Sequence, residues 1–252
     1  MNKGMLAILS VTAVGLGALV VRLQRAFAPM RGVCATGPLA EGLWAIRDRG
    51  VAGFVVGDGT TAIAIDTGVN AARFARGLAM LPVDPGTVEA VYLTHADRDH
   101  IAGIGLYPKA RLVLPEAEVP VVTGAVPRRI LGLPLKARHS FAHPLATIAD
   151  GETVTHGSIS IRAIHTPGHT PGATSYLVNG RWLLTGDLLM LRNGVAEVTW
   201  PAINDNTAQS LASIRRLAGG MDGLLDGVQL LVTAHTGSTG DLRRALAPFR
   251  SH

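Results

Sequence analysis

Residues 90–100 read AVYLTHADRDH, a short apolar segment that runs directly into a cluster of ionisable side chains. Ala90–Thr94 is rich in apolar and β-branched residues, which predicts a strand. Four side chains that can bind a metal follow within six residues: His95, Asp97, Asp99 and His100. A tight turn after a strand end can bring alternate side chains to one point. We therefore expect His95 and Asp97 to face one ion, and Asp99 and His100 to face a second.

Ionisable residues also close four other candidate strands or the loops that follow them. In chain order they are Asp66, His169, Asp187 and His235. The loop that presents His169 contains two Pro-Gly pairs, which predict a rigid conformation. A buried apolar strand has no structural need for an ionisable residue at its tip, and such residues are usually paired, hydrogen-bonded or bound to a metal. The five strand ends together predict one metal site.

Short β-rich runs alternate with helical stretches from about Gly37 onward. Strand candidates are residues 43–47, 54–57, 61–66, 90–94, 111–114, 158–164, 173–178, 181–185 and 230–234. Helix candidates are residues 71–81, 206–217 and 241–249. Asn179-Gly180 between two strand candidates predicts a two-residue hairpin turn. Because strands dominate both halves of the chain, the pattern predicts two sheets between helical layers, and not a doubly wound parallel sheet.

The composition excludes several classes of protein. The 252 residues include one cysteine, Cys34, so neither an internal disulfide framework nor a multi-thiolate zinc site is possible. Nine histidines remain as candidate nitrogen ligands. The aromatic content of 4% argues against a base-stacking surface, and the net charge of +5 is not gathered into a long basic run. We therefore expect no nucleic-acid partner.

Residues 4–21 carry no charge and are flanked by basic residues. Eighteen residues without a charge are at the short end of what spans a bilayer. Residues 1–30 are therefore predicted to form a hydrophobic helix that acts as a transmembrane anchor, with a cleaved export signal as the alternative. This predicts a membrane location and contact with the membrane through this segment, while the flanking charges leave the orientation open. The catalytic domain is expected over residues 37–250.

The stretch 115–147 breaks the alternation of strands and helices. It contains five prolines together with several basic residues, and it predicts a long surface excursion. Long loops on a compact domain are often lids over a site. A solvated loop without a role in binding is the alternative.

The ordered set of motifs resembles the metallo-β-lactamase superfamily, in its glyoxalase II-like branch, over residues 37–250. The resemblance implies an α+β fold, a four-layer αββα sandwich, and a dinuclear site built from an H-x-H-x-D-H motif, a downstream Gly-His, a bridging Asp and a final His. By position, the first ion would be bound by His95, Asp97 and His169. The second would be bound by Asp99, His100 and His235, with Asp187 bridging the two. Asp66 matches an acid that orients the ligand loop without binding metal.

The motif departs from the family pattern at Asp97, where the second histidine is expected. The resemblance implies two divalent ions, with zinc as the first expectation. A carboxylate is a harder ligand than imidazole, so Asp97 adds manganese or iron as alternatives at the first position. Two divalent ions, the three carboxylates of Asp97, Asp99 and Asp187, and one hydroxide would sum to a neutral site.

The resemblance implies a metal-dependent hydrolase in which a hydroxide shared by the two ions attacks a small-molecule ester, thioester or lactone. Asp99 would be the catalytic residue that orients this hydroxide. A diiron redox enzyme of the same superfamily is one alternative, since such enzymes also carry a carboxylate at the position of Asp97. A membrane-tethered binding protein with a degenerate metal site is another.

Overall fold

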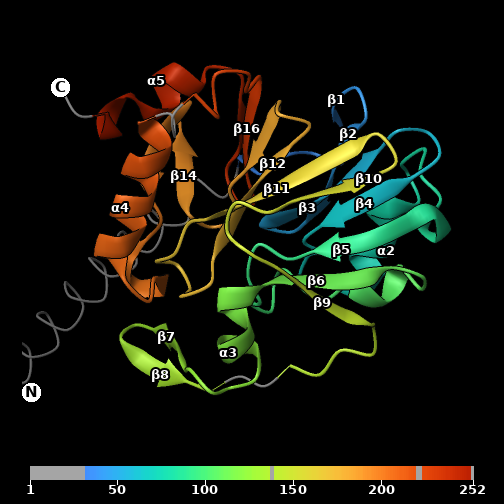
Figure 1. Ribbon diagram of the computed structural model, residues 1–252, viewed down its shortest axis with the longest axis horizontal. Coiled ribbons are helices and arrows are strands. Elements are labelled where there is room, and N and C mark those ends of the chain that lie inside the picture. Colours follow the sequence, from blue (N-terminus) through green and yellow to red (C-terminus); the bar gives the residue numbers. More distant parts are fainter. Residues whose placement is uncertain (1–31, 137–138, 220–222, 251–252) are drawn as a thin grey trace, which may run out of the picture.

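The computed structural model describes residues 32–136, 139–219 and 223–250, which fold around two β-sheets (Figure 1). The first sheet has the strand order β1-β2-β3-β4-β5-β6-β9. Its members are β1 (Gly37–Ala40), β2 (Leu43–Asp48), β3 (Val51–Gly57), β4 (Ala62–Ile65), β5 (Val88–Tyr92), β6 (Arg111–Pro115) and β9 (Leu145–Ile148). Strands β1 to β4 pair antiparallel, whereas β4, β5, β6 and β9 run parallel.

The second sheet has the order β10-β11-β12-β13-β16-β17 and is antiparallel except for the parallel pair β13·β16. Its members are β10 (Thr153–His156), β11 (Ile159–His165), β12 (Thr174–Val178), β13 (Trp182–Leu184), β16 (Leu230–Thr233) and β17 (Gly237–Thr239). Residues 179–181 join β12 to β13, one residue more than predicted, and Asn179 and Gly180 have φ of 52° and 65°. Two successive positive φ angles are the signature of a type I′ turn, so the predicted hairpin is confirmed.

Helices cover the outer faces of both sheets (Figure 1). The described α-helices are α2 (Ala71–Leu78), α3 (Val119–Val122), α4 (Thr207–Ala218) and α5 (Leu242–Leu246), with 3₁₀ turns at 85–87, 104–106, 116–118, 201–203 and 247–249. One apolar cluster fills the space between the sheets, a second lies between the first sheet and α2, and a third lies between the second sheet and α4 and α5. Three buried layers separate four structural layers, so the predicted αββα arrangement is present.

Helices α2 and α4 begin where the sequence provides caps. The side chain of Asn70 accepts a hydrogen bond from the backbone N–H of Arg73 at 2.9 Å, and Asn206 does the same for Gln209 at 3.0 Å. These bonds satisfy backbone donors that the first turn of a helix leaves free. Helix α2 then buries Phe74 and Leu78, one helical turn apart, against the first sheet.

All nine strand candidates and all three helix candidates occur, with boundaries that differ by a few residues. The sequence reading missed several short strands, including β1, β9, β10 and β17, and two hairpins: β7 (Arg128–Ile130) with β8 (Leu133–Leu135), and β14 (Leu189–Arg192) with β15 (Val195–Val198). Three- and four-residue strands on partly exposed edges carry too few apolar positions for a periodic signal.

The predicted membrane location needs correction. Within the described residues, no helix is long and apolar enough to cross a membrane. The apolar residues there belong instead to short strands such as Val51–Gly57, whose side chains fill the layers between sheets and helices. The predicted hydrophobic helix, anchor or signal segment over residues 1–30 lies outside the described residues.

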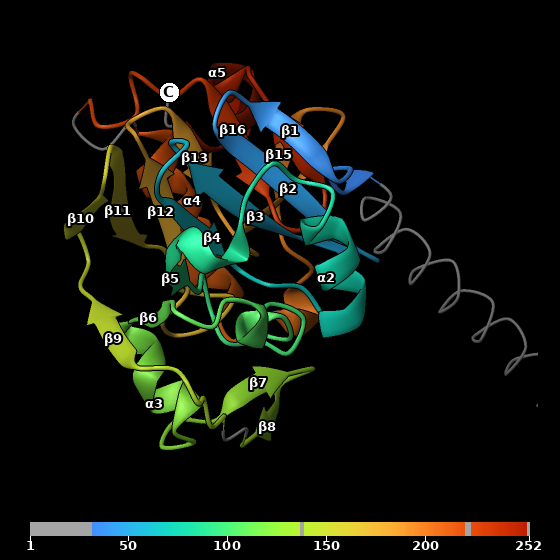
Figure 2. The same ribbon diagram turned by 90° about the vertical axis from the view of Figure 1, so that its right-hand side faces the viewer.

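The long excursion predicted over residues 115–147 has structure of its own. It contains α3 and the β7–β8 hairpin, which extend from one end of the sandwich in both views (Figure 1, Figure 2). Leu131, Leu133 and Leu135 of the hairpin are exposed, whereas Arg128 at its start is buried. The backbone N–H of Leu131 bonds to the carbonyl oxygen of Ala202, which fixes the hairpin against the segment before α4.

Candidate metal centre

Strand direction brings the predicted site residues to one edge of the sandwich. Parallel strands end on the same side, so β4 and β5 deliver Asp66 and the 94–100 loop together, and β13 and β16 deliver Asp187 and His235 together. Strand β11 shares the direction of β13 because both pair antiparallel with β12. The loop after β11, which carries His169, therefore reaches the same edge.

Asp66 holds the 94–100 loop in place. One of its carboxylate oxygens accepts the backbone N–H of Thr94 at 2.9 Å, and the other accepts the Thr94 hydroxyl at 2.7 Å. The second oxygen also lies 2.8 Å from Nδ1 of His100, which leaves the opposite ring nitrogen, Nε2, facing the centre of the site. The Thr94 hydroxyl is in turn 3.0 Å from Nδ1 of His95. Asp66 thus orients both histidines of the motif without joining the cluster.

The first half of the cluster consists of His95, Asp97 and His169. Oδ2 of Asp97 lies 3.7 Å from Nε2 of His95 and 3.3 Å from Nε2 of His169. Two ligands of one tetrahedral ion, each about 2.0–2.1 Å from it, are roughly 3.3 Å apart. The spacing therefore suits one divalent ion between these atoms.

Two neighbours fix the position of His169. Its Nδ1 lies 3.2 Å from Oδ1 of Asn204, whose amide nitrogen donates to the carbonyl oxygen of Thr199 at 3.0 Å. Gly168 precedes it with φ of +136°, and a Cβ at this position would lie 2.2 Å from the backbone nitrogen of Ser210. Only glycine can occupy this position, because the loop passes so close to α4.

The second half of the cluster consists of Asp99, His100 and His235. Oδ2 of Asp99 lies 3.9 Å from Nε2 of His100 and 3.5 Å from Nε2 of His235. The Nδ1–H of His235 donates to the carbonyl oxygen of Gly50 at 2.6 Å, which turns the other ring nitrogen toward Asp99. Asp99 is the most exposed member of the cluster, with 38% of its side chain accessible.

Asp187 joins the two halves. Its Oδ1 lies 3.5 Å from Nε2 of His100, and its Oδ2 lies 3.1 Å from Nε2 of His235 and 3.5 Å from Nε2 of His169. Nε2 of His95, Nε2 of His100 and Oδ1 of Asp187 are buried and form no hydrogen bond with any described residue. Buried polar atoms without partners are costly, and converging nitrogen and oxygen donors of this kind fit divalent metal ions.

The charges of the cluster are strongly coupled. Burial and the neighbouring His100 lower the pKa of His95 well below its usual value, so its Nε2 carries a free lone pair. Burial opposes ionisation of His100 and His235, but nearby carboxylates outweigh it, so Asp66 and Asp187 raise the pKa of His100 and Asp187 raises that of His235 to about 9. Burial would raise the pKa of Asp187, yet His235 and His100 hold it well below its usual range. An ion that binds here must therefore displace protons.

Arg128 contacts the first half of the cluster, which the sequence reading did not foresee. Its Nε donates to both oxygens of Asp97 at 3.0 and 3.2 Å, and its Nη2 donates to Oδ2 at 3.0 Å. Nη2 also lies 3.2 Å from Nε2 of His169. The sequence analysis counted three carboxylates and no cationic side chain at the site. The guanidinium of Arg128 adds one positive charge at the first half.

Comparison with known proteins agrees with this geometry. Residues 46–225 match the family model described as the metallo-beta-lactamase superfamily. This chain is a member of the metallo-β-lactamase superfamily. Members of this superfamily bind divalent metal ions, and the His/Asp cluster provides donors for them in this chain.

Relatives within the superfamily differ in their named activities. A hydroxyacylglutathione hydrolase from Aeromonas hydrophila is 29% identical over 185 residues, which cover 66% of this chain and 61% of that protein. A mitochondrial persulfide dioxygenase from Homo sapiens is 30% identical over 100 residues, which cover 39% of this chain and 32% of that protein. The chain spans about half the length of the curated relatives that it matches.

The fold similarity to solved superfamily structures is broader than the sequence similarity. A B3 metallo-β-lactamase described as having an active-site glutamic acid superposes with a TM-score of 0.62. The superposition covers 91% of each chain at 19% sequence identity. This result supports the fold alone. It agrees with the resemblance to the superfamily that the strand-end motifs indicated.

Glu118 is a second residue near the centre that the sequence reading missed. It is fully buried, and its carboxylate accepts hydrogen bonds from the backbone of Ala96 at 3.0 Å, the hydroxyl of Thr170 at 2.7 Å and the backbone of Gly172 at 3.1 Å. It therefore ties the loop of Asp97 to the loop of His169. The only available signal was its place in the long 115–147 excursion, because no local spacing marks it.

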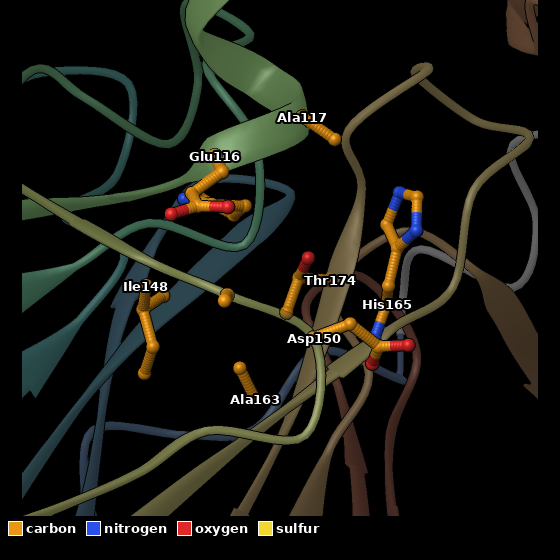
Figure 3. Close-up of a pocket in the computed structure, with 9 residues that line it drawn as sticks. Glu116, Ala117, Ile148, Asp150, Ala163, His165 and Thr174 are labelled. Carbon is orange, nitrogen blue, oxygen red and sulfur yellow. The ribbon is translucent and has the colours of Figure 1, made fainter.

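A separate pocket of about 380 Å³ lies beside the loop that precedes His169 (Figure 3). Its walls include Glu116, Asp150 and His165, and none of the seven predicted ligands lines it. The backbone N–H of His165 donates to Asp150 at 2.7 Å, and its ring Nε2 lies 3.1 Å from the carbonyl oxygen of Pro171. His165 thus supports the loop from outside the cluster.

Proposed function

We propose that this chain is a metal-dependent hydrolase that cleaves an ester, thioester or lactone bond in a small molecule. The observation that carries the proposal is the position of Asp187, whose two oxygens lie within 3.5 Å of histidines from both halves of the cluster. A carboxylate in this position can contact two ions at once. The proposed ligands are His95, Asp97 and His169 for one ion, Asp99, His100 and His235 for the other, and Asp187 for both.

Bound divalent ions would supply Lewis acidity and lower the pKa of a water molecule, so that hydroxide forms near neutral pH. The chain's own residues would organise the reaction around that chemistry. Asp99 is accessible from solvent and lies beside His100 and His235, so its carboxylate can accept a hydrogen bond from the attacking water and orient it. The same carboxylate can take up the proton that the water releases.

The proposed place for the substrate is a pocket of about 520 Å³ beside the motif, which residues next to the ligands line and the seven ligands themselves do not. Arg98, which lies between Asp97 and Asp99 in the sequence, lines it together with apolar side chains such as Ile101 and Phe141. A cationic group on an apolar wall suits a small molecule with an anionic part and a hydrocarbon part. We include residues 37–250 in the proposed catalytic domain because both sheets and all of these groups lie within that range.

The proposed metals are zinc first, with manganese or iron as alternatives at the position of Asp97. Imidazole ligands suit zinc, whereas a carboxylate adds oxygen character that suits manganese. In the variant Asp97→His we expect the ratio of bound zinc to bound manganese to rise when apoprotein is given equal concentrations of both. Plasma mass spectrometry of the desalted protein measures this ratio. Equal metal preference in wild type and variant would contradict the assignment.

A redox reaction is the second candidate. The observation in its favour is the similarity of 100 residues to the persulfide dioxygenase from Homo sapiens. In that case the centre would hold iron, and the enzyme would consume oxygen.

One experiment separates the two candidates. Full-length protein is purified, its metals are quantified, and the same sample is tested with ester, thioester, lactone, β-lactam and phosphodiester substrates and in an oxygen electrode with persulfide. We expect bound divalent metal and turnover of an ester, thioester or lactone that is lost in Asp187→Asn. Oxygen consumption with bound iron and no hydrolysis would favour the redox reaction. The absence of bound metal would contradict both.

A further inference from the structure

Arg128 fills the first half of the metal centre with a positive charge. Its side chain is buried, with only 4% exposed. Three of its contacts reach the oxygens of Asp97, and a fourth reaches Nε2 of His169. Arginine has no acceptor, so it can only donate to His169, and Nε2 of that ring uses its lone pair to receive the bond. Nη2 has two N–H groups for three acceptors, Asp97, His169 and the carbonyl oxygen of Ile203, so one N–H is shared between two of them.

The same lone pair would be needed to bind an ion. One imidazole nitrogen can accept an N–H or coordinate a metal, but it cannot do both at once. Oδ2 of Asp97, which faces both His95 and His169, is likewise held by the guanidinium. A cationic side chain and a divalent cation in the same space would also repel each other. Arg128 in this position and a metal ion in the first half are therefore mutually exclusive.

The second half has no such competitor. Asp99, His100 and His235 form no hydrogen bond or ion pair with a lysine or arginine among the described residues. Their ring nitrogens are oriented by the carboxylate of Asp66 and the carbonyl oxygen of Gly50, so Nε2 of each histidine faces Asp187. An ion that binds this half displaces protons from its histidines, but it displaces no lysine or arginine side chain.

Arg128 is held in place from the opposite side as well. Its Nη1 donates to Asp205 and to the carbonyl oxygen of Arg129 at 2.6 Å, and its Nη2 donates to the carbonyl oxygen of Ile203 at 2.6 Å. The backbone N–H of Asp205 donates to the carbonyl oxygen of His169 at 3.0 Å, so the anchor of Arg128 is tied to the ligand loop itself. The guanidinium is therefore bound on both sides, and its withdrawal would break several charge-assisted hydrogen bonds.

We propose that Arg128 makes the two halves of the centre fill in order. The first ion binds to Asp99, His100, His235 and Asp187 while Arg128 remains in place. The second ion binds to His95, Asp97 and His169 only when the guanidinium withdraws. Arg128 is thus a positioning residue that sets the metal stoichiometry. This inference rests on the metal centre of the proposed function, but it does not depend on which bond that centre cleaves.

The test is a zinc titration of full-length apoprotein by calorimetry, with bound zinc counted by plasma mass spectrometry after desalting. For wild type we expect one tight equivalent and a second that is weaker by about tenfold or more. In Arg128→Gln we expect the gap between the two dissociation constants to shrink by about tenfold or more, because the competing cation is gone. Arg129→Gln is the matched control: it changes the exposed neighbour on the same strand but keeps the backbone groups that contact Arg128 and Asp205, and we expect the wild-type gap.

Two equal sites in wild type, or an unchanged gap in Arg128→Gln, would overturn the inference. If Arg128→Gln does not fold, Asp205→Asn removes one anchor of the guanidinium and should narrow the gap by a smaller amount. An unchanged gap in that folded variant would overturn the inference equally. If wild type binds no zinc, manganese or iron, the metal centre itself is wrong, which is distinguishable from the failure of Arg128 to order the two sites.

Discussion

The two halves of the candidate metal centre have similar donors but different surroundings. His95, Asp97 and His169 are supported by side chains of distant segments, namely Glu118, Arg128 and Asn204. Asp99, His100 and His235 rest on Asp66 and on the backbone at Gly50. The first half is therefore embedded in polar side chains that neutralise and brace it, whereas the second half opens to solvent through Asp99.

This difference shows that a carboxylate at position 97 is not an isolated change. A buried guanidinium holds Asp97 through both of its carboxylate oxygens. A histidine at this position could not be held in the same way, because a neutral ring offers only one lone pair. The residue and its partner form a unit in the first half. The second half retains the donors that the superfamily resemblance implies.

We expect the largest effect from a change of Asp187, the residue that the two halves share. Asp187→Asn replaces a carboxylate oxygen by an amide nitrogen that cannot bind a metal. We expect both halves to lose affinity and hydrolytic activity to fall by more than about 100-fold, beyond the 10- to 100-fold that changes of a residue supporting a ligand produce. Metal content and initial rates measure this, with Asp226→Asn, an exposed acid, as the control. Full metal content in Asp187→Asn would show that the halves are independent.

A smaller effect is expected from Asp66→Asn, which acts on the second half directly through His100 and on the first half only indirectly, through Thr94 and His95. The carboxylate accepts from Thr94 on both oxygens and from Nδ1 of His100, and an amide can provide only one acceptor atom. We expect metal affinity of the second half to fall by about 10- to 100-fold. The zinc titration measures this, with thermal unfolding of the apoprotein as the control for folding. A loss confined to the first half would contradict the role assigned to Asp66.

Much of the centre could be predicted because its donors follow strands. An apolar run such as Ala90–Thr94 indicates where a strand ends, and strand direction then determines which ends meet. The structure accordingly brings the seven predicted ligands into one cluster around Asp187, and it places Asp66 behind His100.

The supports of the first half could not be predicted in this way. Arg128 bonds to Asp97 and to Asp205, which lie 31 and 77 positions away in the sequence. Glu118 bonds to Ala96 and to Gly172 from another segment again. Such contacts leave no local periodicity, and the Pro-rich excursion that carries both residues predicted a surface loop whose fold could not be derived from its pattern.

Glu118 links the two loops of the first half, and its burial makes the stability of the fold depend on pH. Burial, which outweighs the hydrogen bonds from Thr170 and Ala96, raises the pKa of its carboxyl from 4.5 to about 7. The unfolded chain therefore ionises first as pH rises, and the folded state binds the extra proton between about pH 4.5 and 7. Stability from this group is fully present below pH 4.5 and is lost as pH rises through 7, by about 3 kcal/mol at most.

Glu118→Gln removes this titration, because an amide stays neutral while keeping one acceptor for the loop backbone. We expect the unfolding free energy of wild type, relative to that of the variant, to fall as pH rises from about 4.5 to about 7. Chemical unfolding of chelator-treated protein at a series of pH values measures it. A difference that does not vary with pH would show that the hydrogen bonds of the carboxyl balance its burial, so that folding does not shift its pKa. In either case the affinity of the second half for zinc should be unchanged, because none of the hydrogen bonds of Glu118 reaches Asp99, His100 or His235. A lower zinc affinity of the second half in Glu118→Gln would instead show that Glu118 supports both halves.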